Sequence, residues 1–263
     1  MTAAQAKPRG KLVLVPNALD LGTDTEVDLR EVLPQAVIAR AATLGHWVAE
    51  NAKTTRALLK RVHALVPLAL PLQQIQITEL PRPPKGGAAG KVGAPAPDLK
   101  PLLAAALAGH DIGLLSEAGL PAVADPGAAL VQAAHALGIV VVPMSGPSSL
   151  LLALAASGLN GQSFAFVGYL PVEPAARAAR IRELEAVSRR LGQTQIAIET
   201  PYRNDALLAA LVQHLQPGTQ LAVACGLTLP GERCDSRSVQ AWRASPGAPL
   251  GGRLPAVFSW LAG

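Results

Sequence analysis

Cysteine is scarce in this sequence: Cys225 and Cys234 are the only two among 263 residues, and neither belongs to a CxxC pair. A disulfide framework and a cysteine-based zinc site are therefore not expected, and two isolated thiols are typical of a protein in the reducing cytoplasm. The five histidines are scattered without HxxxH spacing. We therefore interpret each as a core or surface residue and expect no metal site.

Aromatic residues and long apolar runs are also few. The chain contains three Trp, two Tyr and three Phe, which argues against a single-strand nucleic-acid platform, since such platforms stack bases on rings. No apolar run reaches the roughly eighteen residues of a membrane helix, and the run 12–15 is too short for the apolar region of a signal peptide. We expect a soluble protein with no membrane partner.

The chain does have a large apolar fraction and a mild excess of positive charge. Hydrophobic residues make up 50% of the sequence, enough for a sizeable core. Lys and Arg number 23 against 18 Asp and Glu, which leaves a formal net charge of +5. This balance mildly favours a polyanionic partner, because cationic side chains neutralise phosphates and release counterions.

Short apolar runs alternate with helical patterns in the first half of the chain. Residues 11–16, 46–51, 111–116 and 139–144 read as nearly continuous apolar strands, and residues 30–44, 54–66, 97–108 and 128–137 as the helices between them. Strands covered by helices on both faces show such continuity instead of alternation. The pattern predicts an α/β fold with a mainly parallel sheet.

A second series of elements follows. Its strands are expected at 163–170, 195–199, 220–227 and 256–261, and its helices at 175–191 and 204–215. We place a domain boundary near residues 146–160, which gives an N-terminal α/β domain of residues 1–150 and a C-terminal α/β domain of residues 151–263. The segment 81–97 is rich in Pro, Gly and Ala and is predicted to be a mobile loop without catalytic residues.

Three segments could face a ligand, and each has an ordinary structural alternative. The loop SEAGLPAVADPG, residues 116–127, follows a predicted strand, where open α/β sheets bind ligands; it could equally be a well-capped strand-to-helix connection. The segment GPSS, residues 146–149, opens a helix whose free N–H groups could meet a polar ligand or simply need a cap. In IETPYR, residues 198–203, Glu199 and Arg203 could form an ion pair that closes the loop.

In combination, these segments resemble the tetrapyrrole methylase superfamily, and within it the ribose 2′-O-methyltransferases of 16S rRNA. The motifs that show this resemblance are S-[DE]-A-G-x-P-x-x-x-D-P-G at 116–127, G-P-S-S at 146–149 and E-[ST]-x-x-R at 199–203. GYLP at 168–171 resembles the family's G-[FY]-L-P segment, and AENAKTTRALL at 49–59 aligns without a gap on A-E-D-T-R-x-T-R-x-L-L. The similarity runs from about residue 10 to the C-terminus.

The resemblance implies two α/β domains, usually in a homodimer, with S-adenosylmethionine (SAM) in the cleft between them. Gly119, Pro121, Ala122 and Val123 would then form a main-chain wall around SAM. The residues that the resemblance assigns to the cofactor are Pro16, Ser116, Ala118, Gly119, Pro121, Ala122, Val123, Asp125, Ser148, Ser149, Tyr169, Leu170, Leu227, Thr228 and Ala256.

The departures from the family pattern concern the substrate side more than the SAM loops. The first strand ends in Pro16-Asn17-Ala18-Leu19-Asp20 instead of P-T-P-I-G-N, and A-E-D-T-R becomes Ala49-Glu50-Asn51-Ala52-Lys53. The family's A-R-E-L-T-K is Ala224-Cys225-Gly226-Leu227-Thr228-Leu229, without its charges, and a terminal K-G-E is replaced by Arg253-Leu254-Pro255. The exchange of Arg for Lys at position 53 replaces a bidentate phosphate grip with a point charge.

Methyl transfer from a sulfonium to a ribose oxygen needs alignment, exclusion of water and a base or cation near the oxygen. We assign Glu50 as base or orienter, Lys53 as electrostatic stabiliser, and Arg56 and Arg203 as phosphate clamps, although each could be structural. The arginines of the helix 175–191 either bind RNA or form a solvated face. The expected partner is rRNA or the small ribosomal subunit; the alternatives are a methylase of a tetrapyrrole or other small molecule, and a paralogue that binds SAM without turnover.

Overall fold

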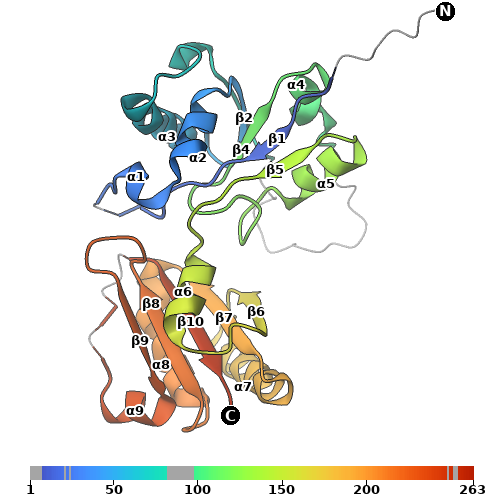
Figure 1. The fold of residues 1–263 in the computed structure, drawn as a ribbon. Coiled ribbons are helices and arrows are strands. Elements are labelled where there is room, and N and C mark those ends of the chain that lie inside the picture. The colour runs from blue at the N-terminus through green and yellow to red at the C-terminus, as the bar shows by residue number, and fades with distance from the viewer. Residues whose placement is uncertain (1–7, 21, 24, 82–97, 248, 251–253) are drawn as a thin grey trace, which may run out of the picture. The chain divides into compact units, whose positions relative to one another are not determined.

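The structure is a computed structural model that describes residues 8–20, 22–23, 25–81, 98–247, 249–250 and 254–263. The chain divides into two compact units (Figure 1). The N-terminal unit comprises Met1–Leu21 and Asp28–Pro147, and the C-terminal unit comprises Gly22–Val27 and Ser148–Gly263. Each unit contains a five-stranded sheet with helices packed on it, so the protein has the α/β fold that the sequence predicts.

The N-terminal unit is built on a parallel sheet in the order β3-β2-β4-β1-β5. Its strands are β1 (Leu12–Leu14), β2 (His46–Ala49), β3 (Gln76–Glu79), β4 (Ile112–Leu115) and β5 (Val141–Pro143). All the pairings between these strands are parallel, which confirms the prediction for this half of the chain. The sequence did not predict β3, because its residues QITE are mostly polar and exposed at the edge of the sheet.

Helices and 3-10 turns connect these strands. They are α1 (Leu29–Val32), α2 (Gln35–Ala42), α3 (Ala52–Leu65), α4 (Ala104–Leu107) and α5 (Ala128–Ala136), with 3-10 turns η1 (Leu72–Gln74) and η2 (Lys100–Leu103). The single helix predicted over 30–44 is wrong, since Pro34 lacks an N–H group and disfavours helical geometry at Leu33. The described part of the predicted helix 97–108 is instead a 3-10 turn followed by the short α4.

Both faces of the central strands are buried. Leu12, Val48 and Leu114 belong to an apolar cluster completed by side chains of η2, α4 and α5. On the other face, Trp47 packs so closely over Gly113 that a Cβ at position 113 would lie 2.5 Å from its Cε3 atom. Burial on two faces explains why these strands read as continuous apolar runs. Because both faces are buried, polar side chains of this sheet lie mainly at the ends of the strands.

The C-terminal unit has a mixed sheet in the order β6-β7-β10-β8-β9. Its strands are β6 (Phe164–Gly168), β7 (Thr194–Glu199), β8 (Gln220–Cys225), β9 (Arg233–Ser238) and β10 (Ala256–Leu261), and its helices are α6 (Ser149–Ser157), α7 (Pro174–Leu191), α8 (Asn204–His214), α9 (Val239–Ala244) and the 3-10 turn η3 (Pro201–Arg203). The β6–β7 pair is parallel and the other pairs are antiparallel. Neither β9 nor α9 was predicted, because RCDSRS has no apolar run and α9 is short.

No helix in the described part of the chain is long and apolar enough to span a bilayer. The loop predicted over 81–97 lies outside the described residues, apart from Pro81.

Candidate functional site

The loops that follow β1 and β4 lie side by side at the carboxyl edge of the parallel sheet. Asn17 N–H donates to Gly119 O at 2.9 Å, and Gly119 N–H donates to Asn17 O at 3.2 Å, so the two loops form an isolated antiparallel bridge. The carboxyl edge of an open α/β sheet is where ligands bind. The bridge brings Pro16, on the first loop, close to the cofactor-binding residues that the sequence predicted on the second.

Asn17 holds the two loops together with its side chain as well, although the sequence did not predict it as a site residue. Its Nδ2 donates to Glu117 O at 2.9 Å, and its Oδ1 accepts from Ala18 N–H at 2.9 Å. Asn17 is buried, with 4% of its surface exposed. An amide side chain directly after an apolar strand was the signal in the sequence, because such a group needs hydrogen-bond partners once it is buried.

The loop from Ser116 to Gly127 has an unusual main chain. Gly119 has a φ of 68°, and the non-glycine residues Ala122 and Ala124 have φ values of 66° and 62°. Each alanine in this left-handed region costs about 1–2 kcal/mol. Such strain persists where surrounding structure imposes it, and it is common in ligand-binding loops. Of the predicted residues here, Pro121 is buried, Ala118 and Ala122 are half-buried, and Val123 is exposed.

The hydroxyl of Ser116 stands at the start of this loop, directly after β4. The residue is 2% exposed, and its Oγ has no hydrogen-bond partner among the residues that the structure describes. Buried hydroxyl groups in native proteins nearly always have a partner. A polar atom of a bound ligand could supply the hydrogen bond that the Ser116 hydroxyl lacks.

Three carboxylates come together at the ends of β2 and β4. Glu50 Oε2 accepts from Glu117 N–H at 3.2 Å, and Glu117 Oε1 accepts from Asn51 Nδ2 at 2.9 Å. Burial, together with the charges of Glu50 and Glu117, raises the pKa of Asp125 to about 7. Burial likewise raises the pKa of Glu50. Predicted residues Glu50 and Asp125 thus share one electrostatic environment with Glu117, which was not predicted.

The start of α3 borders a polar cavity of about 320 Å³. Asn51 caps the helix, since its Oδ1 accepts from Lys53 N–H at 2.9 Å. Lys53 lines the cavity together with Asn17, Asp20, Asn51, Thr54, Ala57, Leu58, Arg61 and Glu117. The Asp20–Arg61 ion pair, at 2.9 Å, is largely buried there. Arg56 is exposed on the same helix and is not among the lining residues.

The remaining predicted residues belong to the C-terminal unit. Ser148 is the buried N-cap residue of α6 and makes no side-chain capping bond, and Ser149 begins that helix. Leu170 and Ala256 are buried, Leu227 is half-buried, and Tyr169 is exposed. Thr228 has a φ of 66°, and its buried Oγ1 lacks a partner among the described residues.

Arg203 is committed to an ion pair within the C-terminal unit. Its Nη2 and Nε donate to Glu199 Oε1 at 2.7 and 3.1 Å, and the Glu199 side chain is 2% exposed. The guanidinium also lies 5.6 Å from the centroid of the Tyr202 ring. This geometry is that of a loop-closing pair, which the sequence left open as the alternative to a phosphate clamp.

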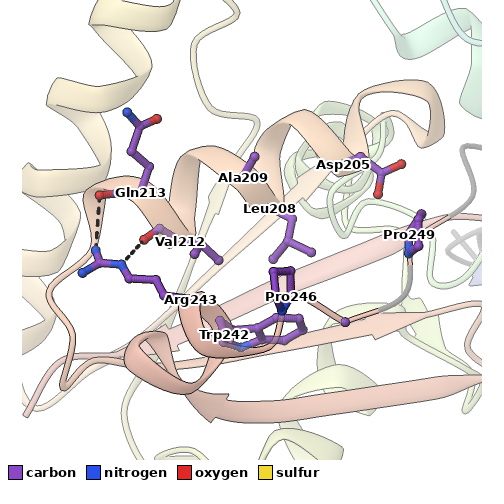
Figure 2. A pocket seen from close by; sticks show the side chains of 10 residues that line it. Asp205, Leu208, Ala209, Val212, Gln213, Trp242, Arg243, Pro246 and Pro249 are labelled. Atoms are coloured by element: carbon purple, nitrogen blue, oxygen red, sulfur yellow. Dashed lines mark hydrogen bonds between the residues drawn. The ribbon is translucent and has the colours of Figure 1, made fainter.

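A second cavity, of about 730 Å³, lies in the C-terminal unit (Figure 2). Leu208 and Val212 of α8 face Trp242 and Pro246 across it, and Arg243 closes one end by donating to Val212 O at 2.9 Å. The residues predicted for the cofactor and for catalysis are not among its lining residues. We therefore place the candidate site at the carboxyl edge of the N-terminal sheet.

Fold and loops together define a two-unit α/β protein with a strained, glycine-containing loop at the ligand-binding edge of a parallel sheet. Residues 35–238 match the family model of the Tetrapyrrole (Corrin/Porphyrin) Methylases. Because this match covers most of the chain, the protein belongs to that family, as the sequence motifs predicted.

Curated relatives agree with the family. The "Ribosomal RNA small subunit methyltransferase I" of Mesorhizobium japonicum is 40% identical over 140 residues, which are 53% of this chain and 46% of that protein. The protein of the same name from Xylella fastidiosa is 46% identical over 85 residues, 32% of this chain and 31% of its own length. The chain thus spans less than half the length of the curated relatives it matches.

A solved structure supports the fold alone. The crystal structure of the methyltransferase CobJ matches with a TM-score of 0.53 at 15% identity, over 95% of this chain and 93% of that chain.

Proposed function

We propose that this chain is a SAM-dependent methyltransferase whose donor binds at the loops after β1, β2 and β4. The loop Ser116–Gly127 carries the proposal. Gly119 has a φ of 68°, which favours glycine, and a Cβ there would lie 3.3 Å from Leu19 Cδ2 and 3.5 Å from Pro147 O, so a large side chain at this position would crowd the loop. The Ser116 hydroxyl in the same loop has no partner among the residues that the structure describes, and it suits a donor with polar atoms.

SAM supplies a methyl group on a positively charged sulfur, and the chain's residues must align the acceptor, exclude water and receive a proton. In transfer to a hydroxyl, an O–CH₃ bond forms, the S–CH₃ bond breaks with its electron pair remaining on sulfur, and the hydroxyl proton leaves. Glu50 is our candidate for the group that orients the hydroxyl or takes this proton. Its raised pKa, caused by burial, brings it closer to the operating pH that suits a general base.

For the acceptor we propose a ribose hydroxyl of small-subunit rRNA. The names of the curated relatives support rRNA, and the net charge of +5 favours a polyanion. Lys53 and Arg56 are exposed on α3, where they could contact phosphates beside the site. A cytoplasmic location and a homodimer remain predictions, as does the role of Ser148, Ser149, Tyr169, Leu170, Leu227, Thr228 and Ala256 in holding the donor.

Donor binding is tested by calorimetry with SAM on Gly119→Trp and on a matched control, Gly192→Trp. Both positions have positive φ values, 68° and 57°, so both substitutions carry a similar backbone cost. A Cβ at Gly192 meets nothing within 4 Å, whereas one at Gly119 enters the proposed wall. We expect Gly119→Trp to abolish SAM binding and Gly192→Trp to retain it; normal binding by Gly119→Trp would show that the site is misplaced.

The acceptor is tested by incubation with labelled SAM and ribosomal RNA from a strain that lacks this protein, followed by mapping of the labelled nucleotide. Label on a ribose of small-subunit RNA supports the proposal. Label on a base, or on an added tetrapyrrole and not on RNA, overturns the acceptor and keeps the methyltransferase.

A second candidate function is donor binding without turnover. The ion pair between Arg203 and Glu199 favours this second function, because a guanidinium that is already paired binds phosphate poorly. SAM binding without label transfer to RNA or tetrapyrrole would support this reading.

A further inference from the structure

The exposed side of α3 carries a row of basic residues. Lys53, Arg56 and Lys60 are exposed, and so is His63 near the end of the helix. Their spacing of three, four and three residues places all four side chains on one side of α3, because residues three or four apart are neighbours on a helix surface. The row is about 15 Å long, since an α-helix rises by about 1.5 Å per residue. We call these four residues the α3 row.

The segment that contains the α3 row has an unusual charge balance. Residues 51–78 hold four of the 23 Lys and Arg of the chain and none of its 18 Asp and Glu. This segment alone therefore supplies four of the five net positive charges. Basic charge concentrated on one helix face is typical of a surface that binds a polyanion.

The elements that pack against α3 do not neutralise the row. These elements include α2, η1 and β3. The charged residue of α2 is Arg40, η1 has none, and Glu79 of β3 accepts from Ala52 N–H at the start of α3. Arg61, on the same helix, is paired with Asp20 at 2.9 Å. By contrast, the lysines and the arginine of the row form no ion pair with any residue that the structure describes.

The row suits a sugar–phosphate backbone better than a membrane surface. A helix that lies on a bilayer buries its apolar face in the lipid, but Leu58, Leu59 and Val62 of α3 are buried in the protein. The exposed positions beside the cations are Ala57 and Ala64, whose small side chains allow a phosphate chain to approach closely.

His63 adds a donor of a different kind to the end of the row. Its Nδ1 accepts from Leu68 N–H at 3.3 Å, so the hydrogen of the neutral ring is on Nε2. This bond orients the exposed ring and leaves Nε2 as a hydrogen-bond donor for a phosphate or ribose oxygen.

The other basic helix, α7, is more nearly neutralised by its own surroundings. Arg180 is paired with Glu183 at 2.8 Å, and Arg189 Nε donates to Gly263 O at 2.9 Å. α7 also contains Glu185, whereas α3 contains no acidic residue. The comparison favours α3 over α7 as the surface for a polyanion.

We propose that the α3 row binds the sugar–phosphate backbone of the RNA beside the nucleotide that is methylated. The inference rests on the proposed function and identifies a contact surface for its RNA. The row begins at the candidate site, because Lys53 lines the polar cavity together with Asn17. Phosphate contacts fix the position and register of a nucleic acid and do not read its bases. The row therefore positions the RNA, and the choice of nucleotide depends on other residues.

The experiment is equilibrium binding of the full chain to small-subunit ribosomal RNA, taken from a strain that lacks this protein, over a series of potassium chloride concentrations. We expect Lys60→Ala to reduce the slope of log affinity against log salt by about 0.7–0.9, because one phosphate contact is lost. The double variant Arg56→Ala/Lys60→Ala should reduce it by about twice as much. Lys60→Arg keeps the charge and should keep the native slope.

Two further variants serve as comparisons. Lys100→Ala is the matched control, since it removes the same charge from an exposed position of η2, a turn whose Leu103 packs in the apolar cluster with α4 and α5. It should keep the native slope. Arg182→Ala removes an exposed charge from α7 and tests that helix as the rival surface. Calorimetry should give the same SAM affinity for Lys60→Ala as for the native protein.

The outcomes separate this inference from the proposed function. If the native protein binds SAM but not this RNA, the proposed rRNA acceptor fails and the inference fails with it. If the native protein binds and methylates the RNA while Lys60→Ala keeps the native slope, only the inference fails. A reduced slope in Arg182→Ala alone would place the RNA on α7. Weaker binding of Lys60→Ala to phosphatidylglycerol vesicles, with RNA binding unchanged, would assign the row to a membrane and overturn the inference.

Discussion

Asn17 and Gly119 exchange two main-chain hydrogen bonds, at 2.9 and 3.2 Å, and so join the loop after β1 to the loop after β4. The Asn17 amide adds a bond to Glu117 O at 2.9 Å. This junction determines where Ser116, Gly119 and Asp125 lie relative to the end of β1. The position of the candidate site thus depends on a residue that is not part of the family motif.

Replacement of Asn17 by Ala should destabilise the protein by about 1–3 kcal/mol, because the carbonyl groups of Ser116 and Glu117 lose a buried donor. It should also weaken SAM binding. Denaturant unfolding and calorimetry measure the two effects. Ser188→Ala is the control: it removes a fully buried hydroxyl that bonds to Gln193 O and Ala262 N–H in the C-terminal unit. We expect it to lower stability without changing donor affinity, and equal loss of affinity in both variants would contradict the role of Asn17.

The contribution of Asp125 to the stability of the protein should fall as pH rises from about 4 to about 7. In this interval Asp125 is protonated in the folded state, where its pKa is about 7, and ionised in the unfolded state. Folding therefore takes up a proton, which costs stability as protons become scarce. Asp125→Asn should be more stable than the native protein at about pH 8, by roughly 1–2 kcal/mol after allowance for solvent screening, and similar to it at about pH 4. Parallel stability curves for the two proteins would refute this.

Ala122→Gly should leave stability unchanged or raise it by up to about 1 kcal/mol, because glycine adopts a φ of 66° without strain. The same replacement at Ala179, an exposed position inside α7, should cost about 1 kcal/mol. Thermal unfolding compares the two variants. If both lose similar stability, Ala122 is not held in the left-handed conformation.

Lys53→Ala should reduce the salt dependence of RNA binding by about one unit of slope, since one phosphate contact is lost. The Lys53 side chain is exposed beside the polar cavity, and the described part of the chain offers its ammonium no acidic partner. Binding to RNA over a series of salt concentrations gives the slope. An unchanged slope would remove Lys53 from the substrate face.

Arg203→Ala should destabilise the C-terminal unit by about 2–3 kcal/mol, because the nearly buried Glu199 loses its partner. The double variant with Glu199→Gln should recover part of this loss, since it removes the unpaired charge. Urea unfolding tests both. Native stability in Arg203→Ala, together with weaker RNA binding, would restore the phosphate-clamp role.

Much of the fold could be predicted because burial on two faces leaves a clear pattern. The strands that became β1, β2, β4 and β5 were found as continuous apolar runs, and residues 256–261 were predicted as a strand with the bounds that β10 has. The polar edge strands β3 and β9 were missed, since their stability comes from pairing with a neighbour and not from their own apolar residues. The single helix predicted across Pro34 is wrong because the apolar periodicity continues through a residue that lacks the N–H group a helix needs.

The sequence by itself determined the family, the parallel N-terminal sheet and the loops to inspect, because motif spacing and apolar periodicity are local properties of the chain. Only the tertiary structure shows that Asn17 and Gly119 exchange main-chain hydrogen bonds and that Arg203 forms an ion pair with Glu199. It also shows that Glu117 and Glu50 act electrostatically on Asp125. These relationships join residues whose contacts depend on which strand ends become neighbours. Strand order is set by packing of the whole sheet, and no local pattern encodes it.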